Sequence, residues 1–198
     1  MAAEERRAER RERLLEAGLD VLGTRGYEAT TVRALCERAE LNPRYFYESF
    51  DDLDALLVAV FDRIAAESIE CVVSAVATAP DDALGRARAV IRAFVELMTD
   101  DPRKGRVAFV EAMGNEVLMR RRLDTLQAFA GLVADEARAF YGAKALDPAT
   151  TALTAQMLVG GLTETLIAWL GGSLEVERDQ LVEHAARLFV ASARATAD

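Results

Sequence analysis

The segment from Thr30 to Phe50 restricts the fold of this chain more than any other part of the sequence. Thr31 is suited to cap a short helix that carries Leu35 and Ala39 four residues apart on one face. Asn42 is suited to cap a second helix, because Pro43 then occupies the first helical position, where a missing N–H costs nothing. The segment therefore predicts two short helices joined by a tight turn.

The second of these helices has one apolar and one polar face. Its apolar stripe is formed by Leu41, Phe46 and Phe50. Its outer face carries groups that hydrogen-bond or stack, namely Arg44, Tyr45, Tyr47 and Ser49. Two packed helices with such a polar face form a helix-turn-helix, whose second helix fits the major groove of DNA. We therefore expect double-stranded DNA to be a partner of this chain.

The charge distribution agrees with modest DNA binding. The net charge of −9 argues against strong nonspecific affinity for nucleic acid. Residues 1–50 hold nine Arg against ten Asp or Glu, so nearly all of the net acidity lies in the remainder of the chain. Five arginines gather near the start of the first helix, at positions 6, 7, 10, 11 and 13. A local positive patch of this kind is enough for phosphate contacts.

The rest of the sequence is typical of an all-α protein, because Pro occurs only four times and Ala, Leu, Arg and Glu dominate. We expect long helices over about 5–22, 53–77, 83–98, 115–140, 149–171 and 177–195, and a short helix from Pro102 to Met113. A turn is expected over Thr99–Pro102. The predicted organisation is a three-helix helix-turn-helix domain at residues 1–50 and a larger helical domain at residues 51–198.

Composition indicates a soluble, cytoplasmic protein. Hydrophobic residues make up 52% of the chain and charged residues 29%, which supplies both a core and a wet surface. We find no apolar run as long as a membrane span and no apolar core of a secretory signal, so no membrane partner is expected. Cys36 and Cys71 are far apart and fit a reducing compartment, with Cys36 expected in a small buried slot.

Spaced residues around the helix-turn-helix carry a family resemblance. They are Gly26-Tyr27, Thr30-Thr31-Val32, Leu35-Cys36, Phe46-Tyr47-x-x-Phe50 and Leu56-Leu57. With these residues the chain resembles the TetR family of bacterial transcriptional repressors. The resemblance implies a homodimer joined through the last two helices and a C-terminal domain for ligand binding and dimerisation. It also implies a small-molecule effector that changes the separation of the two recognition helices.

The resemblance also assigns roles within residues 30–50. It places Arg33, Pro43, Arg44 and Tyr45 at base-facing positions, and Thr31, Tyr47 and Ser49 at phosphate-facing positions. Two alternatives stay open, since Arg33 can be an ordinary exposed arginine and Tyr45 a core aromatic. Two departures weaken the predicted DNA affinity. Glu40 stands where the family usually has a glycine in the turn, and Leu53 where it often has a phosphate-binding lysine.

The effector site is predicted only from residue type. Apolar side chains with a few polar groups are typical of small-molecule pockets. The candidates are Phe109, Glu111, Met113, Gln127, Met157 and Glu164. Glu164 lies in a strongly apolar helix, where it can pair with a cationic ligand, face solvent or meet an arginine across the dimer.

The sequence does not favour an enzyme. It has a single histidine, His184, and we find no metal-ligand cluster, phosphate-binding glycine loop or nucleophile motif. We expect no catalytic residues, no cofactor and no metal site. The predicted function is a DNA-binding repressor that a small-molecule effector releases from a palindromic operator. The alternative is a ligand-binding or interaction protein of the same fold that binds DNA weakly, as Glu40, Leu53 and the net charge suggest.

Overall fold

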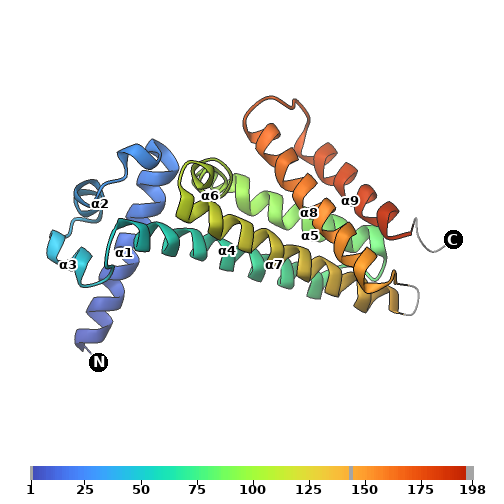
Figure 1. Ribbon diagram of the computed structural model, residues 1–198, viewed down its shortest axis with the longest axis horizontal. Coiled ribbons are helices and arrows are strands. Elements are labelled where there is room, and N and C mark those ends of the chain that lie inside the picture. Colours follow the sequence, from blue (N-terminus) through green and yellow to red (C-terminus); the bar gives the residue numbers. More distant parts are fainter. Residues whose placement is uncertain (1, 143–144, 195–198) are drawn as a thin grey trace. The chain divides into compact units, whose positions relative to one another are not determined.

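The computed structural model describes residues 2–142 and 145–194, and within these ranges the regular structure is helical. The predicted all-α fold is confirmed. The chain divides into two compact units, which Figure 1 locates by sequence colour. Unit 1 comprises residues 1–66 and 98–122, and unit 2 comprises residues 67–97 and 123–198. The predicted boundary after residue 50 concerned function, separating a DNA-binding domain from a ligand-binding one. It is not the boundary between the two compact units, and it stays a prediction.

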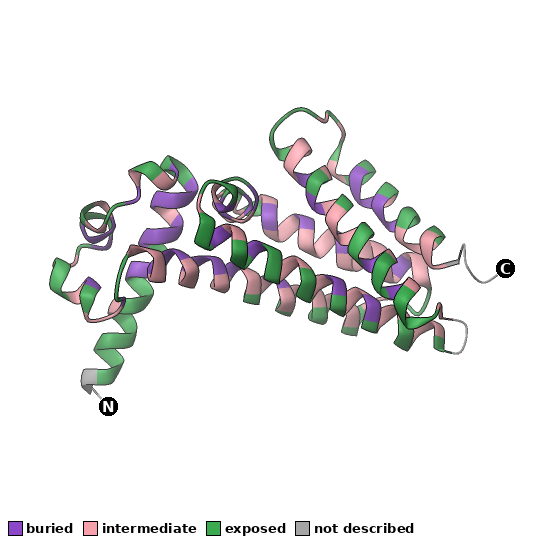
Figure 2. Ribbon diagram, in the orientation of Figure 1, coloured by how far each residue is buried: buried purple, intermediate pink, exposed green. Residues whose placement is uncertain are grey.

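Unit 1 begins with α1 (Ala2–Arg25), η1 (Tyr27–Ala29), α2 (Val32–Ala39), α3 (Pro43–Tyr47) and the first part of α4 (Leu53–Thr78). Their inward faces carry buried residues, which are purple in Figure 2. Fully buried side chains include those of Leu14, Leu22, Leu35, Phe46 and Leu56. This core fixes α3 on α1 and α2, so that the opposite face of α3 is left at the surface.

The rest of unit 1 is the end of α5 (Ala83–Asp100), α6 (Pro102–Phe109), η2 (Glu111–Met113) and the start of α7 (Glu116–Tyr141). The helix predicted from Pro102 to Met113 is wrong as a single element, because it breaks at Val110. The turn predicted over Thr99–Pro102 is shorter than expected, because α5 continues to Asp100 and the Asp101 side chain caps α6. Both differences lie within two residues of a cap, where local signals are weakest.

A close approach joins α6 to α1. A Cβ atom on Gly23 would lie 2.6 Å from the Cβ atom of Arg103, so only glycine leaves room at this contact. Arg103 then reaches along α1, and its Nη1 atom lies 2.9 Å from a carboxylate oxygen of Glu16. Hydrogen bonds to Asp101 and Glu16 raise the pKa of Arg103 further above its usual value. The contact therefore combines tight packing with charge pairing.

Unit 2 holds the rest of α4, α5 and α7 together with α8 (Pro148–Leu170) and α9 (Arg178–Arg194). The predicted end of the last helix, Ala195, lies outside the described residues. Asp147 begins α8 as its N-cap, with Oδ1 accepting from the N–H groups of Ala149 and Thr150 at 3.0 and 3.1 Å. Ala130, Ala134 and Ala155 form a small buried cluster between α7 and α8. Alanine there allows these two helices to pack closely.

The last two helices form a hairpin whose outer face is apolar. They lie side by side in Figure 1, and Trp169 Nε1–H donates to the carbonyl oxygen of Val176 at 2.8 Å across the turn. Leu153, Met157 and Leu188 are exposed to 63%, 70% and 51%. By length and composition α8 meets the requirements of a membrane span, the one helix among the described residues that does so. Thr and Gly interrupt the apolar residues of α8, so no continuous apolar run marks it in the sequence.

Candidate DNA-binding surface and ligand cavity

The two short helices of unit 1 begin as the sequence predicts. The Thr31 hydroxyl oxygen accepts from the N–H of Ala34 at 3.1 Å, and Asn42 Oδ1 accepts from the N–H of Arg44 at 3.0 Å. Pro43 occupies the first turn of α3. Both caps are local, because each acceptor lies two or three residues before its donor. They set where α2 and α3 start and therefore which residues of α3 face outward.

The turn between α2 and α3 contains a strained residue. Glu40 adopts the left-handed conformation, with φ 53° and ψ 45°. Among the described residues it is the one residue other than glycine with a positive φ. Arg13 supports the turn, since its Nη2 donates to the Ala39 carbonyl oxygen at 2.5 Å and lies 3.8 Å from the Glu40 carboxylate. The chain thus keeps the turn without the glycine that its family resemblance leads one to expect.

The side chains on the polar face of α3 and just after it differ in exposure. Arg44 and Tyr47 project from it, with exposures of 81% for the Arg44 side chain and 62% for Tyr47. Tyr45 is half-buried, and the guanidinium carbon of Arg10 lies 4.4 Å from the centre of its ring. Ser49 is also half-buried, and its hydroxyl donates to the Tyr45 carbonyl oxygen at 3.0 Å. Arg44 and Tyr47 are therefore the two most available side chains of α3.

The remaining predicted contacts lie on the same part of unit 1. Pro43 and Thr31 are exposed at the starts of α3 and α2. Arg33 is exposed on α2, and its Nε lies 2.8 Å from a carboxylate oxygen of Glu37, a contact that raises its pKa. Leu53 is half-buried at the start of α4, where Asp52 Oδ1 accepts from the N–H of Ala55 at 2.8 Å. This start of α4 is capped by an acid.

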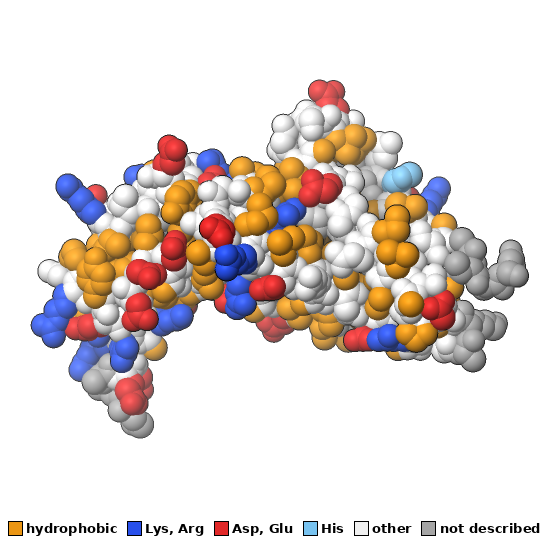
Figure 3. All heavy atoms as spheres, viewed as in Figure 1, with side chains coloured by type: hydrophobic (Ala, Val, Ile, Leu, Met, Phe, Trp, Pro, Cys, Tyr) orange, Lys and Arg blue, Asp and Glu red, His pale blue; other side chains and the backbone are white. Residues whose placement is uncertain are grey.

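Carboxylates accompany the arginines of this surface. Glu48 accepts from Arg44 Nε at 2.9 Å through one oxygen, and its other oxygen lies 3.7 Å from Arg10 Nη2. Its backbone carbonyl accepts from Arg7 Nη2 at 2.7 Å. Figure 3 shows acidic and basic side chains next to one another over the N-terminal helices. A DNA phosphate must therefore compete with Glu48 for the arginines around α3.

Glu111, which the sequence analysis proposed as an effector contact, belongs to a contact network within unit 1. Its Oε2 accepts from the backbone N–H of Tyr27 at 2.9 Å, and its Oε1 accepts from Arg106 Nε at 2.9 Å. Arg106 also donates to the Thr24 carbonyl oxygen at 3.1 Å. Gly26 has φ 85°, which strains any other residue, and a Cβ atom there would lie 3.2 Å from the Glu111 carboxylate and the Arg106 guanidinium. The network ties the segment after α1 to η2.

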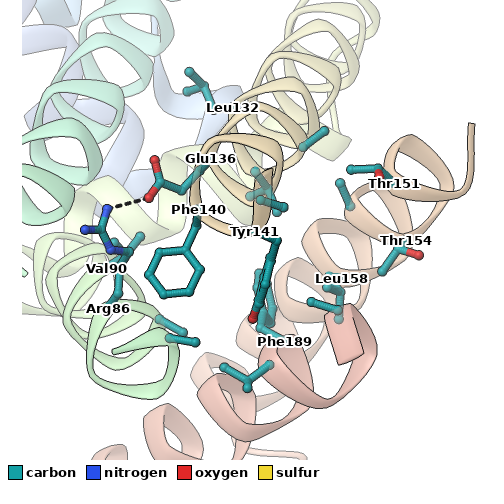
Figure 4. A pocket seen from close by; sticks show the side chains of 18 of the residues that line it. Arg86, Val90, Leu132, Glu136, Phe140, Tyr141, Thr151, Thr154, Leu158 and Phe189 are labelled. Atoms are coloured by element: carbon teal, nitrogen blue, oxygen red, sulfur yellow. Dashed lines mark hydrogen bonds and ion pairs between the residues drawn. The ribbon is translucent and has the colours of Figure 1, made fainter. Parts of the chain in front are cut away.

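A cavity of about 340 Å³ lies within unit 2. Five helices line it, and their side chains are mostly aliphatic or aromatic, as Figure 4 shows. Val76, Val90, Leu132, Leu158 and Phe189 represent α4, α5, α7, α8 and α9. Its polar lining residues are Arg86, Glu136, Tyr141, Thr151 and Thr154. An apolar cavity with a few polar groups is a typical small-molecule site.

The six candidate effector residues do not meet at this cavity. Phe109 is buried in unit 1 and Met113 is exposed there, while Gln127 and Glu164 are exposed on α7 and α8. Met157 lines a separate groove of about 800 Å³ between α8 and α9, together with His184 and Leu188. None of the six lines the cavity of Figure 4. The residues that do line it are mainly Val, Ala and Leu, whose type alone gives no functional signal.

The comparison that bears on the family concerns the helix-turn-helix. Residues 14–60 match the model of the bacterial regulatory proteins of the tetR family. The match covers the helix-turn-helix of unit 1 and the start of α4. Curated proteins give no match in a sequence comparison. Within residues 2–142 and 145–194, no three His, Cys, Asp or Glu residues are grouped to hold a metal ion.

Several solved structures share the fold of this chain over nearly its whole length. FadR from Bacillus halodurans, a fatty acid degradation regulator, is 18% identical with a TM-score of 0.76, covering 91% of this chain and 94% of that one. FadR from Bacillus subtilis, solved with stearoyl-CoA, is 17% identical with a TM-score of 0.77, covering 91% and 98%. A TetR family transcription regulator from Marinobacter aquaeolei VT8 is 17% identical with a TM-score of 0.67, covering 97% and 98%.

Proposed function

We propose that this protein is a cytoplasmic transcriptional repressor of the TetR family that binds a palindromic operator as a homodimer and leaves it when a small molecule occupies the cavity of unit 2. The polar face of α3, held outward by the buried Phe46 and Phe50, is the observation that carries the DNA-binding part. A recognition helix in this setting reads base edges in the major groove.

Arg44 is the best candidate for reading a base. Its guanidinium is long, exposed and able to make two hydrogen bonds to guanine, a contact worth about 1–3 kcal/mol of discrimination. Tyr47 and Thr31 are proposed to contact phosphates, and Pro43 to pack against the edge of a base. Arg33 is proposed to contact DNA after its ion pair with Glu37 breaks. Tyr45 and Ser49 are proposed to support α3, since both are half-buried and hydrogen-bonded or stacked within unit 1.

Selection of bound sequences from a random duplex library tests the DNA-binding role. A regulator enriches a palindrome, because the two heads of a two-fold symmetric dimer read inverted half-sites. Arg44→Ala then lowers affinity for the selected operator more than for random duplex. Equal loss on both duplexes removes the base-reading role of Arg44. If a folded dimer enriches no sequence, the DNA-binding function is wrong.

The proposed homodimer uses the exposed face of α8 and α9. Leu153, Met157 and Leu188 lie on these helices, and a groove of about 800 Å³ runs between them. Exposed apolar patches of this kind mark association surfaces, and a second copy of the same hairpin covers them symmetrically. Met157→Glu should shift the sedimentation coefficient toward that of the monomer. An unchanged dimer in this variant places the association surface elsewhere.

The proposed effector site is the cavity within unit 2. Ala137 lines it, whereas Ala139 is exposed two residues later on the same helix. Ala137→Phe should fill the cavity and abolish effector-induced release from the operator, and Ala139→Phe serves as the matched control. Stearoyl-CoA is a reasonable first compound to test, given the complex of Bacillus subtilis FadR. Release that survives the filled cavity disproves this site.

A second candidate function is a ligand-binding or interaction protein of this fold with little DNA affinity. The pairing of Arg44 and Arg10 with Glu48 favours it, because these arginines are already partly neutralised within the protein. The same selection experiment separates the two functions. In this case the dimer binds ligand normally and enriches no duplex.

A further inference from the structure

The charges that line the cavity of unit 2 balance one another. Arg86 and Glu136 are the two ionisable side chains of opposite sign among its lining residues, and their Nη1 and Oε1 atoms lie 2.6 Å apart. Figure 4 shows this ion pair at one side of the cavity. Phe140 covers the guanidinium, whose carbon lies 5.3 Å from the centre of its ring. Asp81 Oδ1 also lies 3.9 Å from Arg86 Nη2, so two carboxylates face this guanidinium, while its buried Nε has no hydrogen-bond partner among the described residues.

The hydroxyl groups of the cavity differ in how far they are occupied. Thr151 donates to the Leu146 carbonyl oxygen at 3.2 Å. Tyr141 and Thr154 have no hydrogen-bond partner within residues 2–142 and 145–194. The Tyr141 ring packs edge-on against Phe140, with ring centres 5.0 Å apart, and its hydroxyl reaches the cavity wall formed by α9 (Figure 4). Among the described residues, the Tyr141 hydroxyl is therefore an unbonded polar group inside an apolar enclosure.

A charged ligand is disfavoured in such an enclosure. An ion that enters an apolar cavity loses its hydration, and only a free opposite charge compensates that loss. A ligand carboxylate at Arg86 is repelled by Glu136 and Asp81, which already face the guanidinium, and an ammonium group at Glu136 is repelled by Arg86. A neutral oxygen, by contrast, finds the Tyr141 hydroxyl available.

We infer that this cavity selects a neutral, largely apolar molecule with one alcohol, ketone or ester oxygen bound by Tyr141, and rejects free carboxylates and amines. The inference rests on the proposed effector site in unit 2, and it adds the chemical class of the ligand.

The experiment compares ligands with one alkyl chain and different ends. Isothermal titration calorimetry at neutral pH is carried out on the full-length protein with 1-octanol, methyl octanoate, octanoate, octylammonium and octanoyl-CoA. The alcohol and the ester should bind at least about tenfold more tightly than either ion. Tyr141→Phe should weaken 1-octanol binding about two- to tenfold, because it removes one hydrogen bond. Tyr27→Phe, which removes a tyrosine hydroxyl in unit 1, should leave it unchanged.

Two charge variants should each reverse the order of ligand affinities, which a general loss of structure does not do. Glu136→Gln removes the nearer carboxylate from Arg86 and leaves Asp81 at 3.9 Å from Nη2, so octanoate should now bind more tightly than 1-octanol. Arg86→Met leaves Glu136 uncompensated, so octylammonium should gain instead. Thermal melting of both variants verifies that they are folded. If one variant fails to fold, the other still gives the reversal.

The outcomes separate the ligand class from the site. Octanoate, octylammonium or octanoyl-CoA binding as tightly as the neutral compounds to the unchanged protein overturns the inference and leaves the cavity as the effector site. Binding that Ala137→Phe does not affect overturns both the inference and the proposed site. Absence of binding by all five compounds has the same consequence, while the proposed DNA-binding role is unaffected.

Discussion

Glu48→Gln tests whether the carboxylate beside Arg44 and Arg10 weakens DNA binding by unit 1. Glutamine keeps the size of the side chain and removes the negative charge that lies 2.9 Å from Arg44 Nε and 3.7 Å from Arg10 Nη2. The Arg44 side chain is 81% exposed, so breaking its pair with Glu48 costs at most about 1 kcal/mol. The folded state should therefore tolerate the substitution, and its main effect should fall on DNA binding.

The expected gain follows from electrostatics. A DNA phosphate about 8 Å from the Glu48 carboxylate is repelled by roughly 0.5–2 kcal/mol. The lower value applies at the dielectric constant of water and the higher value at that of a protein surface. Salt at about 0.15 M, with a screening length of about 8 Å, keeps the effect near the lower end of that range. We expect random duplex to bind about two- to fivefold more tightly to Glu48→Gln. The slope of log affinity against log salt should steepen by about one, because one more arginine is free to displace a counterion.

Fluorescence anisotropy with a labelled random duplex across a salt series measures both quantities. Glu116→Gln is the matched control, because Glu116 forms an exposed pair with Arg120 on α7 and gives the same change in net charge. That control should leave affinity and slope nearly unchanged. Unchanged or weaker binding by Glu48→Gln refutes the reasoning. So does an equal gain in the control, since the effect is then one of total charge.

Three further predictions concern stability, measured as the free energy of unfolding in denaturant. Glu40→Gly should stabilise the protein by up to about 1 kcal/mol, because glycine adopts the left-handed turn conformation without strain; destabilisation means that the Arg13 contact outweighs the strain. Gly23→Ala should destabilise the protein by about 1–3 kcal/mol, because its Cβ would lie 2.9 Å from the Cα of Arg103. The control Gly131→Ala, with nothing within 4 Å of its Cβ, should stabilise the protein by about 0.5–1 kcal/mol. Equal effects of the two variants contradict the close approach of α6. Hydrogen bonds from Arg88 and Arg187 lower the pKa of Glu183 to about 2. Its contribution to the free energy of unfolding is therefore fully present above the ordinary glutamate pKa and is lost as the pH falls from there through about 2. Glu183→Gln should flatten the dependence of stability on pH in that window, and an unchanged profile rules the contribution out.

The helix-turn-helix was predictable because its signals are local. Thr31, Asn42 and Pro43 act within three residues of where they stand, and Phe46 and Phe50 are buried as their spacing indicates. Most helix limits were found to within a few residues for the same reason. Glu40 adopts the left-handed conformation at the turn position where the family resemblance leads one to expect a glycine.

The contacts that were missed join distant segments. Glu111 accepts a hydrogen bond from Tyr27, which lies 84 residues earlier, and no local pattern indicates that pairing. The cavity of unit 2 is built from five helices, so its lining depends on how they pack. Residue type selected Gln127 and Glu164 for polarity, but both face outward. A polar residue on a helix can be assigned to a site only when the packing of that helix against its neighbours is known.

The hydrogen bond that closes the α8–α9 hairpin has a practical consequence. Trp169 is the one tryptophan of the chain, and its indole N–H is bound to the Val176 carbonyl oxygen. Emission excited at the red edge of the absorption band therefore comes from a single indole at the turn of this hairpin. Its wavelength and anisotropy report on the hairpin in the unlabelled protein, so the proposed association of two chains can be tested in the same cuvette as a DNA titration.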